Sequence, residues 1–186
     1  QCWKINYSLA FALHREGAEC EYLLGLHELA EKHFGELLQR ANTKLEMEDI
    51  YRIILTLYVN LNQNKKCSLL ASNALKLFDI SLPEKPKAYH VLLKLLAIFF
   101  QLKFKKIKNL DKYLVKTDDP IQLAITRVFE PAFTAAYHED PFAFAYIICQ
   151  EILTSMKYGY TDYTLTAYNG FFSILAQQFK MWKTAY

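Results

Sequence analysis

A repeated pair of predicted helices constrains the fold of this chain more than any other feature. Each helix carries apolar residues along one face, and the second pair follows the first at a fixed offset in the sequence. Apolar residues in segment 26–41 recur at steps of three and four, and segment 47–61 repeats this spacing. Gly25 ends the first helix of one pair and Asn62 that of the next, an offset of 62 − 25 = 37 residues. The pattern predicts two regular antiparallel hairpins within 1–80, with helices at about 3–24, 26–41, 47–61 and 65–78.

The middle of the chain, 87–138, is predicted to be helical but irregular. After two helix-breaking prolines the pattern indicates a helix at about 88–102 and a shorter one at about 105–116. An Asp-Asp-Pro sequence then starts a helix that should run from about 120 to 137. Because Pro131 lies inside this helix, we expect it to be kinked or divided there.

A last pair of stripes within 141–186 predicts a C-terminal hairpin, with Gly159 between its helices. The first stripe consists of Phe142, Ala145, Cys149, Ile152 and Met156. The second consists of Leu165, Tyr168, Phe172, Leu175, Phe179 and Trp182.

The expected fold is therefore all-α, a tetratricopeptide-like α-α superhelix of about eight or nine helices. The 37-residue offset is slightly longer than the tetratricopeptide period of about 34. The chain has only five glycines and five prolines in 186 residues, which also favours long helices over a β-sandwich. We expect one helical-repeat domain over 1–186, and because both ends look cut, an internal fragment of a larger protein.

Known catalytic and cofactor motifs do not occur in the sequence. Phosphate-binding loops and the GxSxG elbow are missing, so we expect no enzyme activity and no cofactor in the chain itself. In the most metal-like segment, His27 is followed four residues later by Glu31 where a zinc protease helix has its second histidine, so a partly buried structural histidine is favoured over a metal ligand. The polar group His138, Glu139 and Asp140 precedes a proline, and we expect Asp140 to cap a helix rather than to act as an acid or base.

The cysteines and the hydropathy bear on the location of the protein. Cys2, Cys20, Cys67 and Cys149 have no metal-binding spacing, and their apolar neighbours predict small core side chains. Free thiols fit a reducing compartment, and we expect a cytoplasmic location. No signal peptide is visible, and the longest apolar stretch is about half of the ~20 residues of a membrane span.

Two groups of residues are candidates for an interaction surface. The net charge of +3 is too small to indicate nucleic acid. A local run of lysines could contact phosphate or an acidic partner, although the solvated face of a short helix is the favoured interpretation. Exposed tyrosines are also common in binding surfaces, although tyrosine fills helix interfaces as well. The candidate residues are Lys103, Lys105, Lys106, Lys108, Tyr158, Tyr160 and Tyr163.

Several motifs in order resemble one known family. They include Ala18 to Gly25 (AECEYLLG), Ile50-Tyr51-Arg52, Thr117 to Pro120 (TDDP), Pro131-Ala132-Phe133 and Met156 to Gly159 (MKYG). They resemble the helical-repeat region of very large signalling proteins, in which that region follows a predicted regulatory ATPase. Many such proteins begin with a serine/threonine kinase and end with a sensor histidine kinase. The resemblance implies a tetratricopeptide-like fold; the family's ATPase and kinase motifs do not occur in this chain.

These observations lead to three functional hypotheses. The first is a non-catalytic regulatory and protein-interaction module that couples a nucleotide-binding ATPase domain to an output domain, with an adjacent domain or a signalling protein as partner. The second is a small-molecule sensor that holds its ligand in an aromatic-lined helical groove. The third is a free-standing tetratricopeptide-like adaptor.

Overall fold

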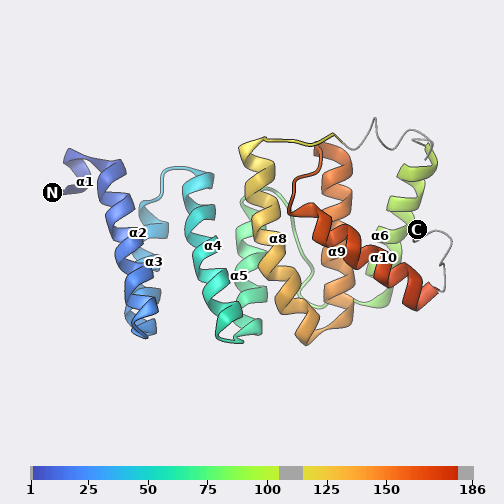
Figure 1. The fold of residues 1–186 in the computed structure, drawn as a ribbon, viewed down its shortest axis with the longest axis horizontal. Coiled ribbons are helices and arrows are strands. Elements are labelled where there is room, and N and C mark those ends of the chain that lie inside the picture. The colour runs from blue at the N-terminus through green and yellow to red at the C-terminus, as the bar shows by residue number, and fades with distance from the viewer. Residues whose placement is uncertain (1, 105–114, 180–186) are drawn as a thin grey trace.

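The computed structural model describes residues 2–104 and 115–179, and within these ranges it is all-helical (Figure 1). Nine helices and no strand are present in that part of the chain, and a single β-bridge joins Lys116 to Tyr160. The helices are α1 Cys2–Ile5, α2 Tyr7–Leu23, α3 His27–Arg40, α4 Lys44–Asn60, α5 Asn64–Lys76, α6 Ala88–Phe104, α8 Pro120–Glu139, α9 Pro141–Tyr158 and α10 Thr164–Phe179.

The first four long helices form two hairpins that repeat with the offset expected from the sequence. Helices α2 and α4 begin 44 − 7 = 37 residues apart, and α3 and α5 begin 64 − 27 = 37 residues apart. Helix α2 packs against α3, and α4 against α5. The polar caps of the first helices are also repeat-related, because Asn6 caps α2 and Thr43 caps α4.

The turn inside each hairpin has the same backbone geometry. Gly25 and Asn62 both have positive φ angles, of 81° and 54°. The Gly25 amide bonds the Tyr22 carbonyl at 2.8 Å, and the Asn62 amide bonds that of Val59 at 3.0 Å. This pairing of a left-handed residue with the last helical carbonyls is the Schellman turn, which needs a residue that tolerates positive φ. The turns thus explain why Gly and Asn recur at this position.

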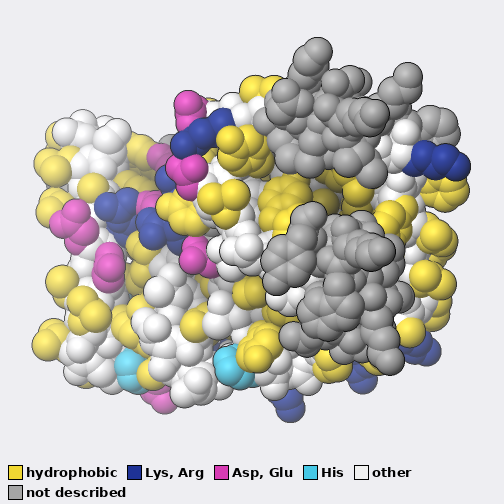
Figure 2. All heavy atoms as spheres, turned by 45° about the vertical axis from the view of Figure 1, so that its right-hand side comes forward, with side chains coloured by type: hydrophobic (Ala, Val, Ile, Leu, Met, Phe, Trp, Pro, Cys, Tyr) yellow, Lys and Arg dark blue, Asp and Glu magenta, His cyan; other side chains and the backbone are white. Residues whose placement is uncertain are grey.

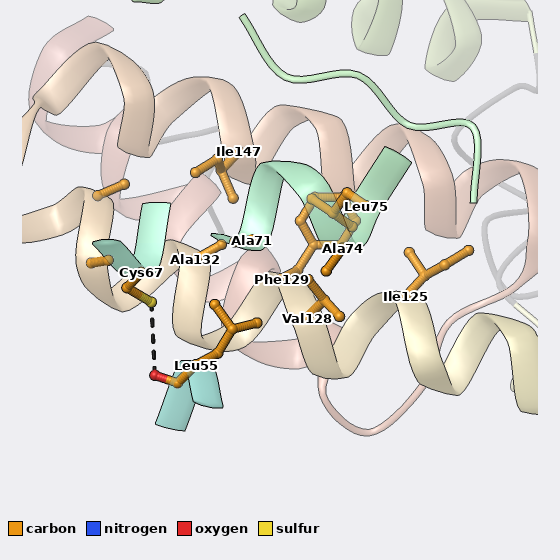
Figure 3. Close-up of a cluster of buried hydrophobic side chains, with 12 residues drawn as sticks. Leu55, Cys67, Ala71, Ala74, Leu75, Ile125, Val128, Phe129, Ala132 and Ile147 are labelled. Atoms are coloured by element: carbon orange, nitrogen blue, oxygen red, sulfur yellow. Dashed lines mark hydrogen bonds between the residues drawn. The ribbon is translucent and has the colours of Figure 1, made fainter. Parts of the chain in front are cut away.

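Helix α8 stacks on the second hairpin and completes the main core. It packs against both α4 and α5, and Figure 1 shows α2, α4 and α8 side by side along the long axis. Small side chains of α5 and α8 face each other in the contact, among them Cys67, Ala71 and Ala132 (Figure 3). The Cys67 thiol lies 3.8 Å from the Leu55 carbonyl oxygen, which it approaches as a weak donor. Small residues let two helix backbones approach closely, and Phe129 and Leu75 fill the adjoining space.

The C-terminal part is built around α9. Helices α8, α6 and α10 all pack against it, so α6 lies beside a helix that comes much later in the chain. Val91, Leu95 and Ile98 of α6 share one core with α9 and α10. The segment after α9 is tied to residues 115–117 by the bond from the Thr117 amide to the Tyr160 carbonyl, of 2.9 Å.

The structure corrects two expectations about helix bounds. The first helix does not run unbroken from residue 3, because the Asn6 side chain accepts a bond from the Leu9 amide and starts a new helix. Pro131 does not divide α8, which continues from Pro120 to Glu139. Burial of α8 against three other helices holds it together across the proline. Residues 105–114 of the helix expected at 105–116 lie outside the part of the chain that the structure describes.

Two expectations about burial hold only in part. In α10 the buried residues are Ala167, Phe171 and Leu175, so of the expected stripe Leu175 is buried, whereas Leu165 and Phe172 are 54% and 40% exposed. Apolar residues lie on more than one face of this helix, so the period alone predicted its buried face only in part. Cys20 is exposed, whereas Cys67 and Cys149 are buried as expected.

Candidate functional site

Helices α2, α4 and α8 each carry one arginine that interacts with Glu48 or Asp49 of α4, and we call these side chains the arginine face. Arg15 comes from α2, Arg52 from α4 and Arg127 from α8. Arg15 and Arg52 are one repeat apart, since 52 − 15 = 37. Their side chains are 31% and 40% exposed, and the Nε atom of Arg15 is buried without a hydrogen-bond partner.

Asp49 joins the first two arginines. Its Oδ1 accepts a hydrogen bond of 2.6 Å from Arg52, and its Oδ2 accepts one from Arg15. Burial would raise the pKa of Asp49, but the bonds from Arg52 and Arg15 outweigh it and hold the pKa below its ordinary value. The carboxylate therefore stays ionised and fixes both arginines in place.

Glu48 lies beneath the face, between α4 and α8. Its side chain is almost fully buried, at 3% exposure, and its Oε1 has no hydrogen-bond partner. Burial raises the pKa of Glu48 to about 7, although the charges of Arg52 and Arg127 oppose the shift. This carboxyl is therefore poised to change its charge near neutral pH, within electrostatic range of Arg52 and Arg127.

The third arginine contacts an aromatic residue that the sequence had marked. The Arg127 guanidinium carbon lies 6.0 Å from the ring centre of Tyr163, which is 40% exposed. This is the outer limit of a cation–π contact. In Figure 2 charged side chains of both signs gather over the part of the molecule that holds the N-terminal helices.

The other predicted surface residues lie apart from this face or outside the described chain. Lys103 is exposed near the end of α6. Lys105, Lys106 and Lys108 lie outside the described residues. Tyr158 ends α9 and has the Lys157 ammonium 4.6 Å from its ring centre, while Tyr160 forms the bridge to Lys116. Of the predicted residues that the structure describes, only Tyr163 has a contact with the arginine face.

The two polar groups considered as metal or acid–base candidates, around His27 and Asp140, take part in packing, ion pairing and helix capping. The His27 ring packs at 4.6 Å on the Tyr22 ring, and Glu31 pairs with Lys66 at 3.4 Å instead of with His27. Asp140 caps α9 by accepting a bond of 2.8 Å from the Phe142 amide, as predicted. In the described ranges no three His, Cys, Asp or Glu side chains converge in a way that could hold a metal.

A second feature is an apolar groove between α6, α8, α9 and α10, with a volume of ≈ 1210 Å³. Aromatic side chains line much of it, including Tyr89, Phe133 and Phe144, and no charged residue is among the described residues of the lining. The sequence predicted an aromatic-lined groove only in general terms. Its position depends on α6 packing against α9, which a local pattern cannot indicate.

Sequence reasoning missed the arginine face, although a signal for it was present. Arg15 and Arg52 recur at the repeat offset, so aligning the hairpins by charge as well as by apolar residues would have paired them. Asp49 and Glu48 carried no comparable signal, since a carboxylate on a helix is ordinarily solvated. Their roles depend on the neighbouring helices.

Comparisons with known proteins return no relative for this chain. No family model matches it, and neither a curated protein nor a solved structure shows significant similarity. Across the described residues, none of the helices has the combination of length and apolar character needed to cross a membrane. The geometry of the chain itself must therefore carry any functional proposal.

Proposed function

We propose that this chain is a non-catalytic protein-interaction module, a tetratricopeptide-like superhelix that binds its partner on the arginine face. The observation that carries the proposal is the placement of Arg15, Arg52 and Arg127 on three neighbouring helices. Repeat proteins stack equivalent helices into an extended surface, so residues at equivalent positions form a row along it. Such a row suits an extended segment with acidic side chains.

The anchoring of the arginines supports binding over a purely structural role. Arginine is enriched at the centres of protein interfaces, where a fixed side chain loses little conformational entropy on binding. Asp49 bonds the guanidinium groups of Arg15 and Arg52, Glu48 adds an attractive charge near Arg52, and both arginine side chains remain partly exposed. The partner chemistry we propose is an acidic protein segment.

The wider role that we propose is regulatory. In a multidomain signalling protein of the kind the sequence resembles, the module would couple a nucleotide-binding ATPase domain to a kinase or other output domain. The partner is then an adjacent domain of the same chain or a cytoplasmic signalling protein.

Deleting residues 1–186 from the full gene product tests the regulatory role. ATPase and kinase activities are measured with and without the segment, together with the assembly state. A change in the dependence of output on nucleotide supports coupling. Unchanged activity and unchanged assembly would sink the proposal.

A further inference from the structure

We propose that the apolar groove between α6, α8, α9 and α10 binds an uncharged amphiphile, a molecule with a long aliphatic or ring-containing body and one hydroxyl or amide group. The groove is separate from the arginine face, and its ligand is independent of the protein partner proposed above. Three observations carry the inference: the exposed apolar walls, the absence of charge, and a polar strip along one side.

The walls of the groove leave large apolar side chains in contact with solvent. Tyr89 and Leu92 of α6 are 55% and 52% exposed, and Phe142 of α9 is 46% exposed. Each square ångström of apolar surface removed from water contributes favourably to binding. The open walls therefore provide a driving force for an apolar body.

The floor of the groove is closed by a close helix contact. A Cβ atom on Gly170 would lie 2.8 Å from Ile148 Cδ1 and 3.3 Å from Phe133 Cε2. Glycine at this position lets α10 lie directly against the side chains of α8 and α9. The ligand is thus held above a packed floor and does not enter the core.

The polar groups of the lining lie on one wall. Thr166, Asn169 and Ser173 follow each other on α10 at steps of three and four, which places them on the same helix face. The Ser173 hydroxyl donates to the Asn169 carbonyl oxygen of its own helix at 3.0 Å. The Asn169 carboxamide, which can donate and accept, is available to bond a hydroxyl or amide of a ligand.

The charge of the lining selects the class of ligand. Because no Lys, Arg, His, Asp or Glu is among the described residues that line the groove, an ionised ligand would lose its hydration there without gaining an ion pair from them. The same absence disfavours an amphipathic peptide helix, whose polar face ordinarily meets charged residues at the rim of its groove. The volume of ≈ 1210 Å³ exceeds that of an ordinary drug-sized pocket of about 300–1,000 Å³, which suits an elongated ligand.

The experiment uses the uncharged fluorophore N-phenyl-1-naphthylamine with the whole chain. We expect the fluorophore to bind saturably. 1-Dodecanol should displace it, and dodecanoate at pH 8 should displace it at least about tenfold less well. Asn169→Leu should weaken the binding of 1-dodecanol about two- to tenfold, which corresponds to the loss of one hydrogen bond. Equal displacement by the alcohol and the carboxylate would overturn the inference.

A matched pair of variants locates the site. Ser173→Trp fills the groove from an exposed position on α10 and should lower the affinity for the fluorophore at least about tenfold, whereas Asn73→Trp, on the surface of α5, should leave it unchanged. Leu92→Arg, also exposed, should act like Ser173→Trp if that variant fails to fold. Equal binding by the groove variants and the control, or displacement by an apolar helical peptide but not by 1-dodecanol, contradicts the proposal.

Discussion

Arg15 and Arg52, which are 37 residues apart and come from equivalent helices, bind the two carboxylate oxygens of a single side chain, Asp49. The bond from Arg15 crosses from α2 to α4, and the bond from Arg52 lies within α4. One carboxylate therefore links two repeats and orders two residues of the proposed binding surface at the same time.

Asp49→Asn should destabilise the fold by about 1–2 kcal/mol. A hydrogen bond to a charged group contributes about 1.5–3 kcal/mol, and partial exposure of both arginines reduces this value. Urea unfolding measures the change. Asp162→Asn, which removes the exposed pair with Lys116, is the control and should destabilise the fold clearly less than Asp49→Asn. Equal losses of stability in the two variants would show that Asp49 contributes no more to the fold than an exposed ion pair does.

The buried carboxyl of Glu151 should make stability depend on pH. Burial raises its pKa to about 8, with a smaller contribution from the negative charge of Glu130. The folded state then binds a proton that the unfolded state releases, so stability is complete below pH ~4.5 and falls as the pH rises to about 8. Glu48, with a pKa of about 7, contributes in the same direction.

Glu151→Gln removes this dependence at one of the two sites. At pH 8 the variant should be more stable than the parent by on the order of 1–3 kcal/mol, with little difference at pH 5. Urea unfolding at pH 5, 6, 7 and 8 measures both. Glu28→Gln, on the surface of α3, should follow the parent at every pH. If the difference in stability between the variant and the parent were the same at all four pH values, Glu151 would not titrate between pH 5 and pH 8.

Asn62→Ala should cost about 1 kcal/mol, and Asn62→Gly should cost nothing or be slightly stabilising. The cause is the positive φ of 54°, which asparagine and glycine adopt more readily than alanine. Thermal unfolding of both variants shows which of them is the more stable. Asn60→Ala, at an exposed position within α4, is the control and should change little. Alanine tolerated equally at both sites would contradict the turn geometry.

The buried thiols should be inert in the folded protein. Burial raises the pKa of Cys67 and of Cys149 to about 12, so neither thiolate is populated at neutral pH, whereas Cys20 is exposed. Iodoacetamide followed by peptide mapping should label Cys20 rapidly, and the other two only in denaturant. Labelling of Cys67 in the native state at the rate of Cys20 would contradict the packing of α5 on α8.

The local features of the fold could be predicted from the sequence. The offset of 37 residues follows from stripes and turn residues that lie close together in the chain, and the Asp140 cap from a short polar motif before a proline. Such features depend on backbone preferences that neighbouring residues determine. Pro131 shows the limit, because α8 continues through it although its local preference allowed a division of the helix.

The candidate sites depend on contacts between distant segments. Helix α6 is apolar on several faces, and nothing in its own sequence indicates that it packs on α9 rather than on α5. The burial of Glu48 likewise results from α8, about 80 residues later in the chain. Both the groove and the arginine face therefore required the three-dimensional structure.

The central claim is that the arginine face binds a partner, and removing two of its charges tests it most directly. Arg15→Gln with Arg127→Gln in the full gene product leaves the Arg52–Asp49 bond intact. Lys32→Gln with Lys65→Gln removes the same charge from exposed positions on α3 and α5. After circular dichroism has shown both double variants to be folded, nucleotide-dependent activity and assembly are measured. The arginine variant should lose the coupling that the lysine variant retains; equal behaviour of the two would contradict the account.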